Sequence, residues 1–348
     1  MSNRQSLRVA ELDAGQTAAW DAFVRARPEG TFFQLSGWKP VLESAFGHRV
    51  HLLAAWRGRT LCGVLPLVEL RNRVFDCALI STAFGTYGGP LADDAATRAR
   101  LDVAAQELGA RLGVAHLEYR LRERLHPDWP CREDRHATFR KAIDPDPDVN
   151  LKAIPRKQRA VVRKARESDL RVGTDESLTD FYRLYALSLR NLGTPVFARR
   201  YLTALKAEFG DACEVTIVRT PEGRAISGVL SFYFRDEVLP YYGGGTPDAR
   251  RNGANDLMYW DVMCRAAGAG GRVFDFGRSK VGSGAYAFKK NWGFTPASLY
   301  HEYALVRGTA LPDKSPDNPK YRAAIRAWQR LPLWAANTLG PPVARELG

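Results

Sequence analysis

The richest concentration of reactive side chains lies in residues 275–294. A strand is expected to end at Phe276, and a loop with three glycines then leads into a short helix that begins near Gly284. Glycines let the backbone approach a ligand closely, and a helix N-terminus offers unpaired N–H groups to an anion. The segment therefore predicts a cradle for a phosphate or carboxylate, to which it contributes Arg278, Lys280, Tyr286, Phe288 and Lys289.

The same residues also fit a structural role, in which Phe288, Trp292 and Phe294 belong to the core and the cations are merely solvated. Four cations follow Asp275 in this stretch without a further acid, which favours the anion-binding interpretation. The loop lacks the closing Gly-Lys-Ser/Thr of a P-loop, so ATP hydrolysis is not expected.

A second candidate segment, residues 239–246, places Tyr241 and Tyr242 immediately before three glycines. At a strand end, Gly243 and Gly244 leave backbone N–H groups free to face a ligand, and either tyrosine could pass or hold a proton. A tight turn with packed tyrosines is the alternative.

A third candidate is the basic segment from residue 151 to 171, where eight cations face two acids and supply six of the thirteen net positive charges. Its apolar residues fall at helical spacing, so one face is expected to pack and the other to be cationic. This pattern is typical of a surface that binds RNA or nucleotide phosphates. A solvated helix joining two halves is the alternative. The cations assigned to phosphate binding are Arg156, Lys157, Arg159, Arg163 and Lys164.

Composition narrows the class of protein. The 348 residues are 45% apolar and 26% charged, as in ordinary globular chains of about two domains. Neither a membrane span nor a signal peptide is evident, so a cytoplasmic location is expected. The five cysteines and six histidines lack the spacing of a disulfide framework or a metal site, and no Gly-x-Ser-x-Gly elbow occurs. We therefore expect no metal and no covalent serine or cysteine intermediate.

The elements that must position these candidates are repeated along the chain. Each half contains an apolar hairpin, a third strand, a Tyr-Gly-Gly sequence, a crossover helix and another strand. This order predicts an α/β (α+β) fold of two mixed sheets, each covered by helices. Coincidence between two generic stretches is the alternative. The matched residues, 165, 155 and 157 positions apart, are Gly63 and Gly228, Tyr87 and Tyr242, and Glu118 and Asp275.

Proline-rich connectors suggest the domain boundaries. Residues 1–148 are expected to form the first domain, and 149–310 a second domain that begins with the basic linking helix. Residues 311–348 are expected to form a C-terminal amphipathic helix or tail, which either docks on the body or lies against anionic lipid.

In its order of motifs the chain resembles the FemAB-like aminoacyltransferases. The match covers about residues 5 to 306 and includes the basic helix between the halves. Its other motifs are Phe32-Phe-Gln-Leu-Ser-Gly-Trp38, Gly88-Gly89-Pro90, and Asp275-Phe-Gly followed by Phe288-Lys289. More narrowly, residues 275–280 and 286–294 resemble the branch associated with exosortase/PEP-CTERM exopolysaccharide systems.

The resemblance implies two tandem GNAT-like (acyl-CoA N-acyltransferase-like) domains. It also implies transfer of an acyl group, typically aminoacyl from a charged tRNA, to an amine of a cell-envelope or exopolysaccharide precursor. Lys289 matches a position at the family's acyl-transfer site. The Gly277-Arg-Ser-Lys280 loop and the lack of a long coiled-coil arm depart from the best-known members, so the acceptor does not carry over. Peripheral contact with the cytoplasmic face of the inner membrane is a further expectation.

The residue chemistry agrees with N-acyl transfer, which requires a base, a group that stabilises the oxyanion, and a cationic groove for a phosphate-rich donor. We expect Lys289 and nearby cations to stabilise negative charge, and Asp275 or Tyr242 to relay a proton. No tightly bound cofactor is expected. One alternative is transfer from acyl-CoA or acyl-carrier protein, for which residues 250–255 nearly match the pyrophosphate motif but end in Asn255. A non-catalytic RNA- or envelope-binding protein is the other.

Overall fold

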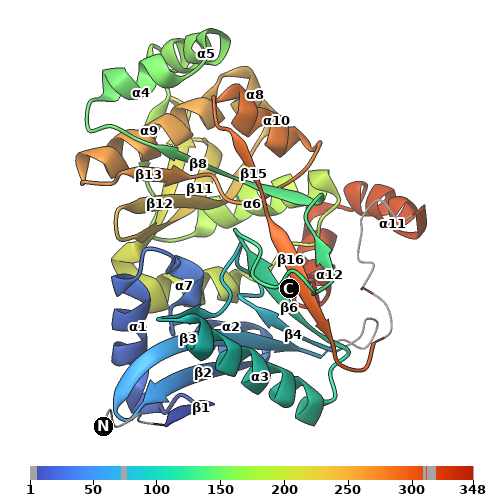
Figure 1. Ribbon diagram of the computed structural model, residues 1–348. Coiled ribbons are helices and arrows are strands. Elements are labelled where there is room, and N and C mark those ends of the chain that lie inside the picture. The colour runs from blue at the N-terminus through green and yellow to red at the C-terminus, as the bar shows by residue number, and fades with distance from the viewer. Residues whose placement is uncertain (1–5, 72–76, 309–310, 312–318, 348) are drawn as a thin grey trace. The chain divides into compact units, whose positions relative to one another are not determined.

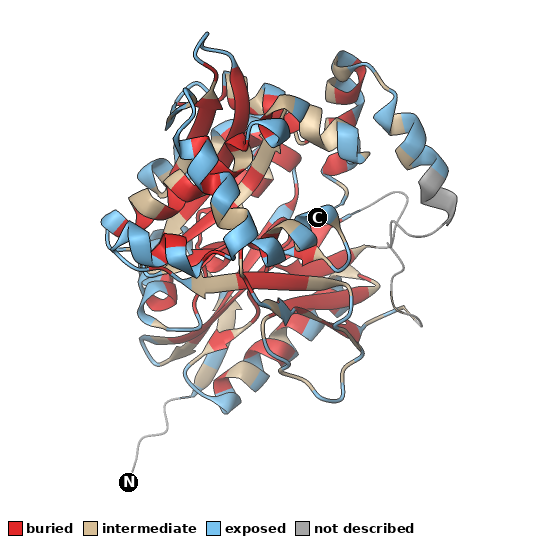
Figure 2. Cartoon of the chain, turned by 90° about the horizontal axis from the view of Figure 1, so that it is seen from above, coloured by how far each residue is buried: buried red, intermediate tan, exposed pale blue. Residues whose placement is uncertain are grey.

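The computed structural model describes residues 6–71, 77–308, 311 and 319–347. The chain forms two compact units, each with its own sheet (Figure 1). The first unit contains residues up to 135 and a return segment that starts at 298. The second contains residues 136–297 and the C-terminal helices. Buried residues concentrate in the strands and on one side of the covering helices (Figure 2).

The sheet of the first unit is mixed. Neighbouring strands are antiparallel except β4 and β6, which are parallel because helix α3 crosses over between them. The strands, in spatial order, are β1 (Leu7–Glu11), β2 (Arg49–Arg57), β3 (Thr60–Leu70), β4 (Ala78–Ser81), β6 (His116–Leu121), β16 (Tyr300–Leu305) and β7 (Cys131–Arg132), with β5 (Leu91–Ala92) paired to β3.

Three α-helices belong to this sheet, and short 3-10 turns precede two of them. The crossover helix begins where the Asp94 carboxylate accepts a hydrogen bond from Thr97 N, and it ends at Gly113, whose φ is +67°. The helical segments are Ala14–Gln16 (3-10), α1 (Thr17–Ala26), Phe32–Gln34 (3-10), α2 (Trp38–Phe46) and α3 (Ala95–Leu112).

The sheet of the second unit repeats this topology, with β12 and β13 parallel and helix α9 as their crossover. Its strands, in spatial order, are β9 (Arg171–Thr174), β10 (Cys213–Arg219), β11 (Ala225–Phe234), β12 (Glu237–Gly245), β13 (Val273–Asp275), β8 (His136–Ala142) and β14 (Ser279–Lys280), with β15 (Pro296–Ser298) paired to β8.

Helices of the second unit cover this sheet directly or pack on the helices that do, and they include the basic segment. That segment is two helices rather than one, because Pro155 lacks an N–H group and separates α4 from α5. The helical segments are α4 (Pro147–Ala153), α5 (Arg156–Arg166), α6 (Thr179–Leu192), α7 (Arg199–Phe209), Gly210–Ala212 (3-10), α8 (Pro247–Arg251), α9 (Ala254–Gly268), α10 (Gly284–Asn291), α11 (Pro319–Gln329) and α12 (Leu333–Ala344).

The predicted pair of helix-covered mixed sheets is confirmed. In each sheet, however, one strand comes from the part of the sequence that was assigned to the other domain. Strand β8 precedes residue 148, yet it pairs with β13 of the second sheet. The final strand β16, expected in the second half, pairs with β6 of the first sheet. Each sheet is therefore completed by a strand from the other half of the sequence.

Candidate functional site

The predicted cradle is built around a buried carboxylate at the end of β13. Asp275 is fully buried, and its carboxylate accepts a hydrogen bond from Gly277 N at 2.7 Å. Arg140 of the adjacent strand β8 donates to the same carboxylate at 3.2 Å. Gly277 has a φ of +64°, a conformation that glycine adopts without strain. The carboxylate thus fixes the sharp turn that leads out of the strand.

Lys289 lies on α10 and points into this turn. Its Nζ donates to the carbonyl oxygens of Phe276, Gly277 and Arg278 at 2.6, 3.1 and 3.2 Å. Burial lowers the pKa of Lys289 to about 8, although the nearby carboxylate of Asp275 opposes the shift. All three ammonium protons have carbonyl acceptors, so the side chain holds the loop backbone in place.

The loop held by Lys289 presents Arg278, which is exposed, and Lys280, which is partly exposed on β14. The aromatic residues of the segment pack inward. Phe288 lies against Tyr259, and Tyr286 packs edge-to-face on Phe139. The aromatic side chains of the segment are therefore packed, and Arg278 and Lys280 are the cations of the predicted cradle that reach solvent.

The second candidate segment forms the last residues of β12. Tyr242 is buried, and its hydroxyl is 2.9 Å from the hydroxyl of Tyr201. Burial among aromatic side chains raises the pKa of Tyr242 well above its ordinary value, so its phenol stays protonated. Tyr241 is partly buried and packs on Phe232. Both tyrosines thus pack among aromatic side chains, and a role of Tyr242 in proton transfer stays a prediction.

The glycines that follow are required by packing. A Cβ on Gly244 would lie 2.6 Å from the carbonyl oxygen of Leu184, so helix α6 approaches β12 as closely as glycine permits. A Cβ on Gly243 would lie 3.1 Å from the hydroxyl of Tyr259. Both glycines also pair with β11. Thr246 N donates to Ile226 O of β11, and N–H directions alternate along an antiparallel strand, so Gly244 N–H faces β11 and Gly243 N–H faces the opposite edge. The expectation of an N–H group that faces a ligand therefore stays a prediction for Gly243.

The parallel strands diverge between the two candidate segments. Their ladder ends at the pair Val238 and Phe274, and β12 continues for seven residues beyond that point. Tyr242 lies four residues along this extension, roughly 13 Å from Val238 at strand spacing. The extension therefore has one edge paired with β11 and one edge that is not part of a ladder with β13.

The third candidate is confirmed as a helix with a packed face. Val162 and Ala165 of α5 are buried, whereas Arg156, Lys157, Arg163 and Lys164 are exposed and Arg159 is partly exposed. Within the described residues, none of these five cationic side chains has a hydrogen-bond or ion-pair partner. Their charge is therefore available to an external anion.

Helix α5 covers the N-terminus of α9. A Cβ on Gly253, the residue before α9, would lie 3.2 Å from the Cβ of Ala165. In the first turn of α9, the buried Asp256 carboxylate accepts from Trp292 Nε1 at 2.9 Å and from the side-chain amide of Gln158 on α5. The start of α9 is thus occupied by a packed helix and a carboxylate.

Several residues that shape these sites were not predicted from the sequence. Thr138 and Arg140 reach Asp275 from β8, a strand with no sequence feature that indicates its partner. Gln158 and Tyr259 were also missed, because a single glutamine or tyrosine in an amphipathic helix carries no distinguishing pattern.

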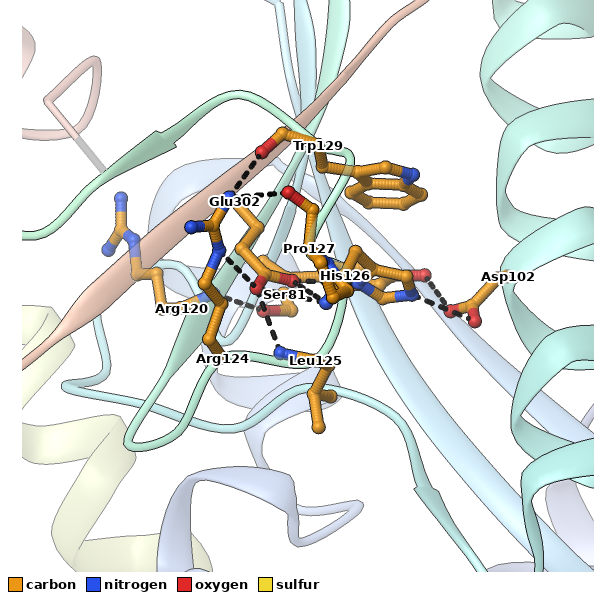
Figure 3. Close-up of polar contacts among 10 residues, drawn as sticks. Ser81, Asp102, Arg120, Arg124, Leu125, His126, Pro127, Trp129 and Glu302 are labelled. Carbon is orange, nitrogen blue, oxygen red and sulfur yellow. Dashed lines mark hydrogen bonds and ion pairs between the residues drawn. The ribbon is translucent and has the colours of Figure 1, made fainter.

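A further cluster in the first unit was also missed (Figure 3). His126 Nδ1 is 2.7 Å from the Glu302 carboxylate of β16, and its Nε2 is 3.1 Å from the Asp102 carboxylate of α3. The imidazole stacks on Trp129 with ring centroids 4.0 Å apart. Burial opposes its charge, but the two carboxylates outweigh this and raise the pKa of His126 to about 9. The histidine therefore links the loop that bears it to a helix and a strand.

Comparisons with known proteins agree with this architecture. Residues 152–290 match the family model described as an acetyltransferase (GNAT) domain. FemX is similar over 84% of this chain and 96% of its own, with a TM-score of 0.68 and 16% identity. A tandem GNAT protein from the clavulanic acid biosynthesis pathway is similar over 88% of this chain and 100% of its own, with a TM-score of 0.54 and 13% identity.

Saccharomyces cerevisiae N-myristoyltransferase is also similar, over 91% of this chain and 84% of its own, with a TM-score of 0.51 and 11% identity. No curated protein matches the chain significantly. At such identities the structural likenesses establish the fold, so the predicted tandem GNAT-like architecture is confirmed.

Proposed function

Starting from a GNAT-type acyltransferase with a tandem GNAT fold, we propose that this chain is an N-acyltransferase whose donor is a charged tRNA. The observation that carries the proposal is helix α5, whose five cations without a partner among the described residues extend over about 12 Å of helix at 1.5 Å per residue. A nucleic acid presents a continuous row of phosphates to such a surface.

An acyl-CoA-type donor is what the GNAT fold suggests by itself, and we keep it as the second candidate. Two contacts favour the tRNA donor. The Asp256 carboxylate in the first turn of α9 opposes an anion there, because a like charge adds repulsion. Ala165 of α5 also packs against Gly253, so it occupies the space next to the start of α9 that a pyrophosphate would need. A donor bound along α5 avoids both obstacles.

The proposed reaction is attack of an acceptor amine on the ester carbonyl of the donor. The amine nitrogen forms the new amide bond, the ester C–O bond breaks, and the proton lost by the amine ends on the tRNA hydroxyl. We assign the stabilisation of the oxyanion to Arg278, which the loop presents to solvent. Lys289 and Asp275 position this loop through the hydrogen bonds described above. Tyr242, whose phenol stays protonated, is assigned to proton donation.

The acceptor in this proposal is an amine of a cell-envelope or exopolysaccharide precursor. Its support is the resemblance of residues 275–280 and 286–294 to the FemAB-like branch described above. The acceptor is therefore tested separately from the donor.

The donor is tested by binding and turnover with charged tRNA, acetyl-CoA and acyl-carrier protein. We expect tRNA binding to weaken as the salt concentration rises. The double variant Lys157→Ala/Arg163→Ala should make the negative slope of the logarithm of the association constant against the logarithm of the salt concentration shallower by roughly 1.4. The control Arg100→Ala/Arg111→Ala removes two exposed cations from α3 and should leave the slope unchanged. Turnover with acetyl-CoA, or tRNA binding unaffected by the α5 variant, contradicts the proposal.

The acceptor is tested by mass spectrometry of envelope and exopolysaccharide precursors from cells with and without the gene. The proposal predicts a species that is heavier by one aminoacyl group only in cells that have the gene. Identical precursor profiles would exclude this acceptor class while leaving the donor assignment open to its own test.

A further inference from the structure

The C-terminal helices α11 and α12 dock on α6 of the second unit. A Cβ on Gly340 would lie 2.9 Å from Val196 N, so α12 packs directly on the backbone that follows α6. The Arg190 guanidinium donates to the carbonyl oxygens of Gln329 and Leu331 at 3.3 and 3.4 Å. Of the two sequence-based alternatives, the structure therefore shows the one in which this region docks on the body.

The outer side of this region remains apolar and uncovered. Trp334 on α12 is 74% exposed, and Leu339 on the same helix is 53% exposed. Five of the ten large exposed apolar side chains in the described part of the chain belong to this region: Leu192 at the end of α6, Trp334, Leu339, Val343 and Leu347. Such a concentration of apolar surface indicates an interaction site, because scattered exposure would be the ordinary pattern.

The chain segment that forms this apolar surface is mainly positive. Residues 319–347 contain five cations and one acid, Glu346. Arg326 and Arg330 are exposed, and Arg330 precedes Trp334 by only four residues. Arg345 is paired with Glu346 at 2.9 Å and contributes little net charge. Apolar side chains rimmed by arginine match the boundary between acyl chains and anionic headgroups, where tryptophan is also favoured.

We propose that the outer face of α12, with the arginines of α11 at its rim, binds the surface of an anionic membrane. No helix among the described residues is long and apolar enough to cross a bilayer. The helix therefore lies in the interface, with Trp334 and Leu339 inserted and the guanidinium groups at the headgroups. This inference goes beyond the proposed transfer reaction and does not depend on its donor.

Sedimentation with lipid vesicles tests this inference on the full chain. We expect binding to vesicles that mix phosphatidylglycerol with phosphatidylcholine, and much weaker binding to phosphatidylcholine alone. The variant Trp334→Ser/Leu339→Ser should bind vesicles at least about tenfold more weakly than the wild type, because both substitutions remove a side chain that inserts among the acyl chains. The variant Arg326→Gln/Arg330→Gln should lose most of the preference for anionic lipid.

Matched controls separate this surface from α5, which is also basic. The variant Lys157→Ala/Arg163→Ala should keep vesicle binding. If that variant loses binding while Trp334→Ser/Leu339→Ser keeps it, the inference is overturned. It is also overturned if the wild type dimerises without lipid and the α12 variant is monomeric, since a second copy then covers the face. Acyl transfer to a soluble acceptor should be equal in the wild type and the α12 variant, so failure of the proposed function is recognised separately.

Discussion

In the first unit, strand β4 stops at Ser81 and the chain turns back, so that Gly88 N donates to the carbonyl oxygen of Arg120 at 2.8 Å. In the second unit, strand β12 continues for seven residues past its last pair with β13. Residues 81–89 of the first unit are all buried. The first unit thus fills the end of its parallel strand pair with its own chain.

The backbone of the filling segment is strained where it turns. Thr82 and Phe84 have φ values of +48° and +66°, which non-glycine residues adopt only at a cost. Gly89 allows close packing, since a Cβ there would lie 2.4 Å from the Leu121 side chain. The two units therefore share a topology but differ in one strand. Only β12 extends beyond its parallel partner and leaves an edge that could bind a ligand, whereas β4 does not.

The two units also share a buried acid that receives a cation from the exchanged strand. In the second unit Arg140 of β8 binds Asp275. In the first, His301 of β16 binds Glu118 at 3.1 Å, and Arg120 binds the same carboxylate at 2.8 Å. Burial opposes the charge of Glu118, but these cations hold its pKa well below the ordinary value. The exchange therefore supplies a counter-charge to each sheet.

The largest expected effect concerns Lys289, which holds the loop after β13 through three backbone carbonyl oxygens. Lys289→Met leaves three carbonyl oxygens without their donor and releases the Arg278 loop. We expect kcat/KM for acyl transfer to fall about a hundredfold, because displaced catalytic groups lose orientation. Steady-state kinetics would measure this. The neighbouring Lys290→Met is the control, since Lys290 is exposed; equal activity of both variants with the wild type would show that the loop is not part of the site.

The counter-charges are expected to be unequal. Arg140→Gln removes a cation from fully buried Asp275 and should lower the free energy of unfolding by about 3 kcal/mol. His301→Gln should lower it by only about 1 kcal/mol, because Glu118 keeps Arg120 and an amide still donates. Urea unfolding of both variants would compare them. Equal losses would mean that the two exchanged strands have equivalent electrostatic roles.

The third prediction concerns the close contact that is specific to β12. Gly244→Ala places a Cβ against the backbone of α6 and should lower the free energy of unfolding by about 1–2 kcal/mol. Gly173→Ala in β9 is the control, because no atom lies within 4 Å of its Cβ and the change should be near zero or slightly stabilising. Thermal unfolding that does not distinguish the variants would disprove the contact.

The smallest expected effect is a dependence of stability on pH that differs in sign between the units. The pKa of His126 is raised to about 9, so its stabilisation is complete below about 6.5 and is lost as the pH rises through 9. The pKa of Lys289 is lowered to about 8, so its burial penalty diminishes as the pH rises from 8 towards about 10.4.

Each contribution to the free energy of unfolding should change by about 1 kcal/mol per pH unit within its range, and by at most about 3 kcal/mol across it. Unfolding curves of His126→Gln and Lys289→Met between pH 6 and 10 would separate them. Relative to the wild type, the histidine variant should lose the decline above pH 6.5. The lysine variant should lose the rise above pH 8, and a change of the opposite sign in either variant would refute the assignment.

Much of the fold followed from local pattern. A crossover helix in each half and a helix that begins near Gly284 were predicted and are observed, because helical periodicity, caps and glycines act within a few residues. The similar sequence separations of matched residues in the two halves, such as Glu118 and Asp275, predicted two similar sheets. Arginine and lysine content alone identified the cationic face of α5.

Tertiary structure decided where strands β8 and β16 pair, because strand sequence specifies a pleated, half-buried surface and not the identity of the neighbour. It also decided the environment of Lys289, whose acceptors are backbone carbonyls present at every residue. The sequence by itself determined which charges and aromatic rings were available. Their partners depended on contacts between segments more than a hundred residues apart, such as Arg140 with Asp275, and these exist only once the sheets have assembled.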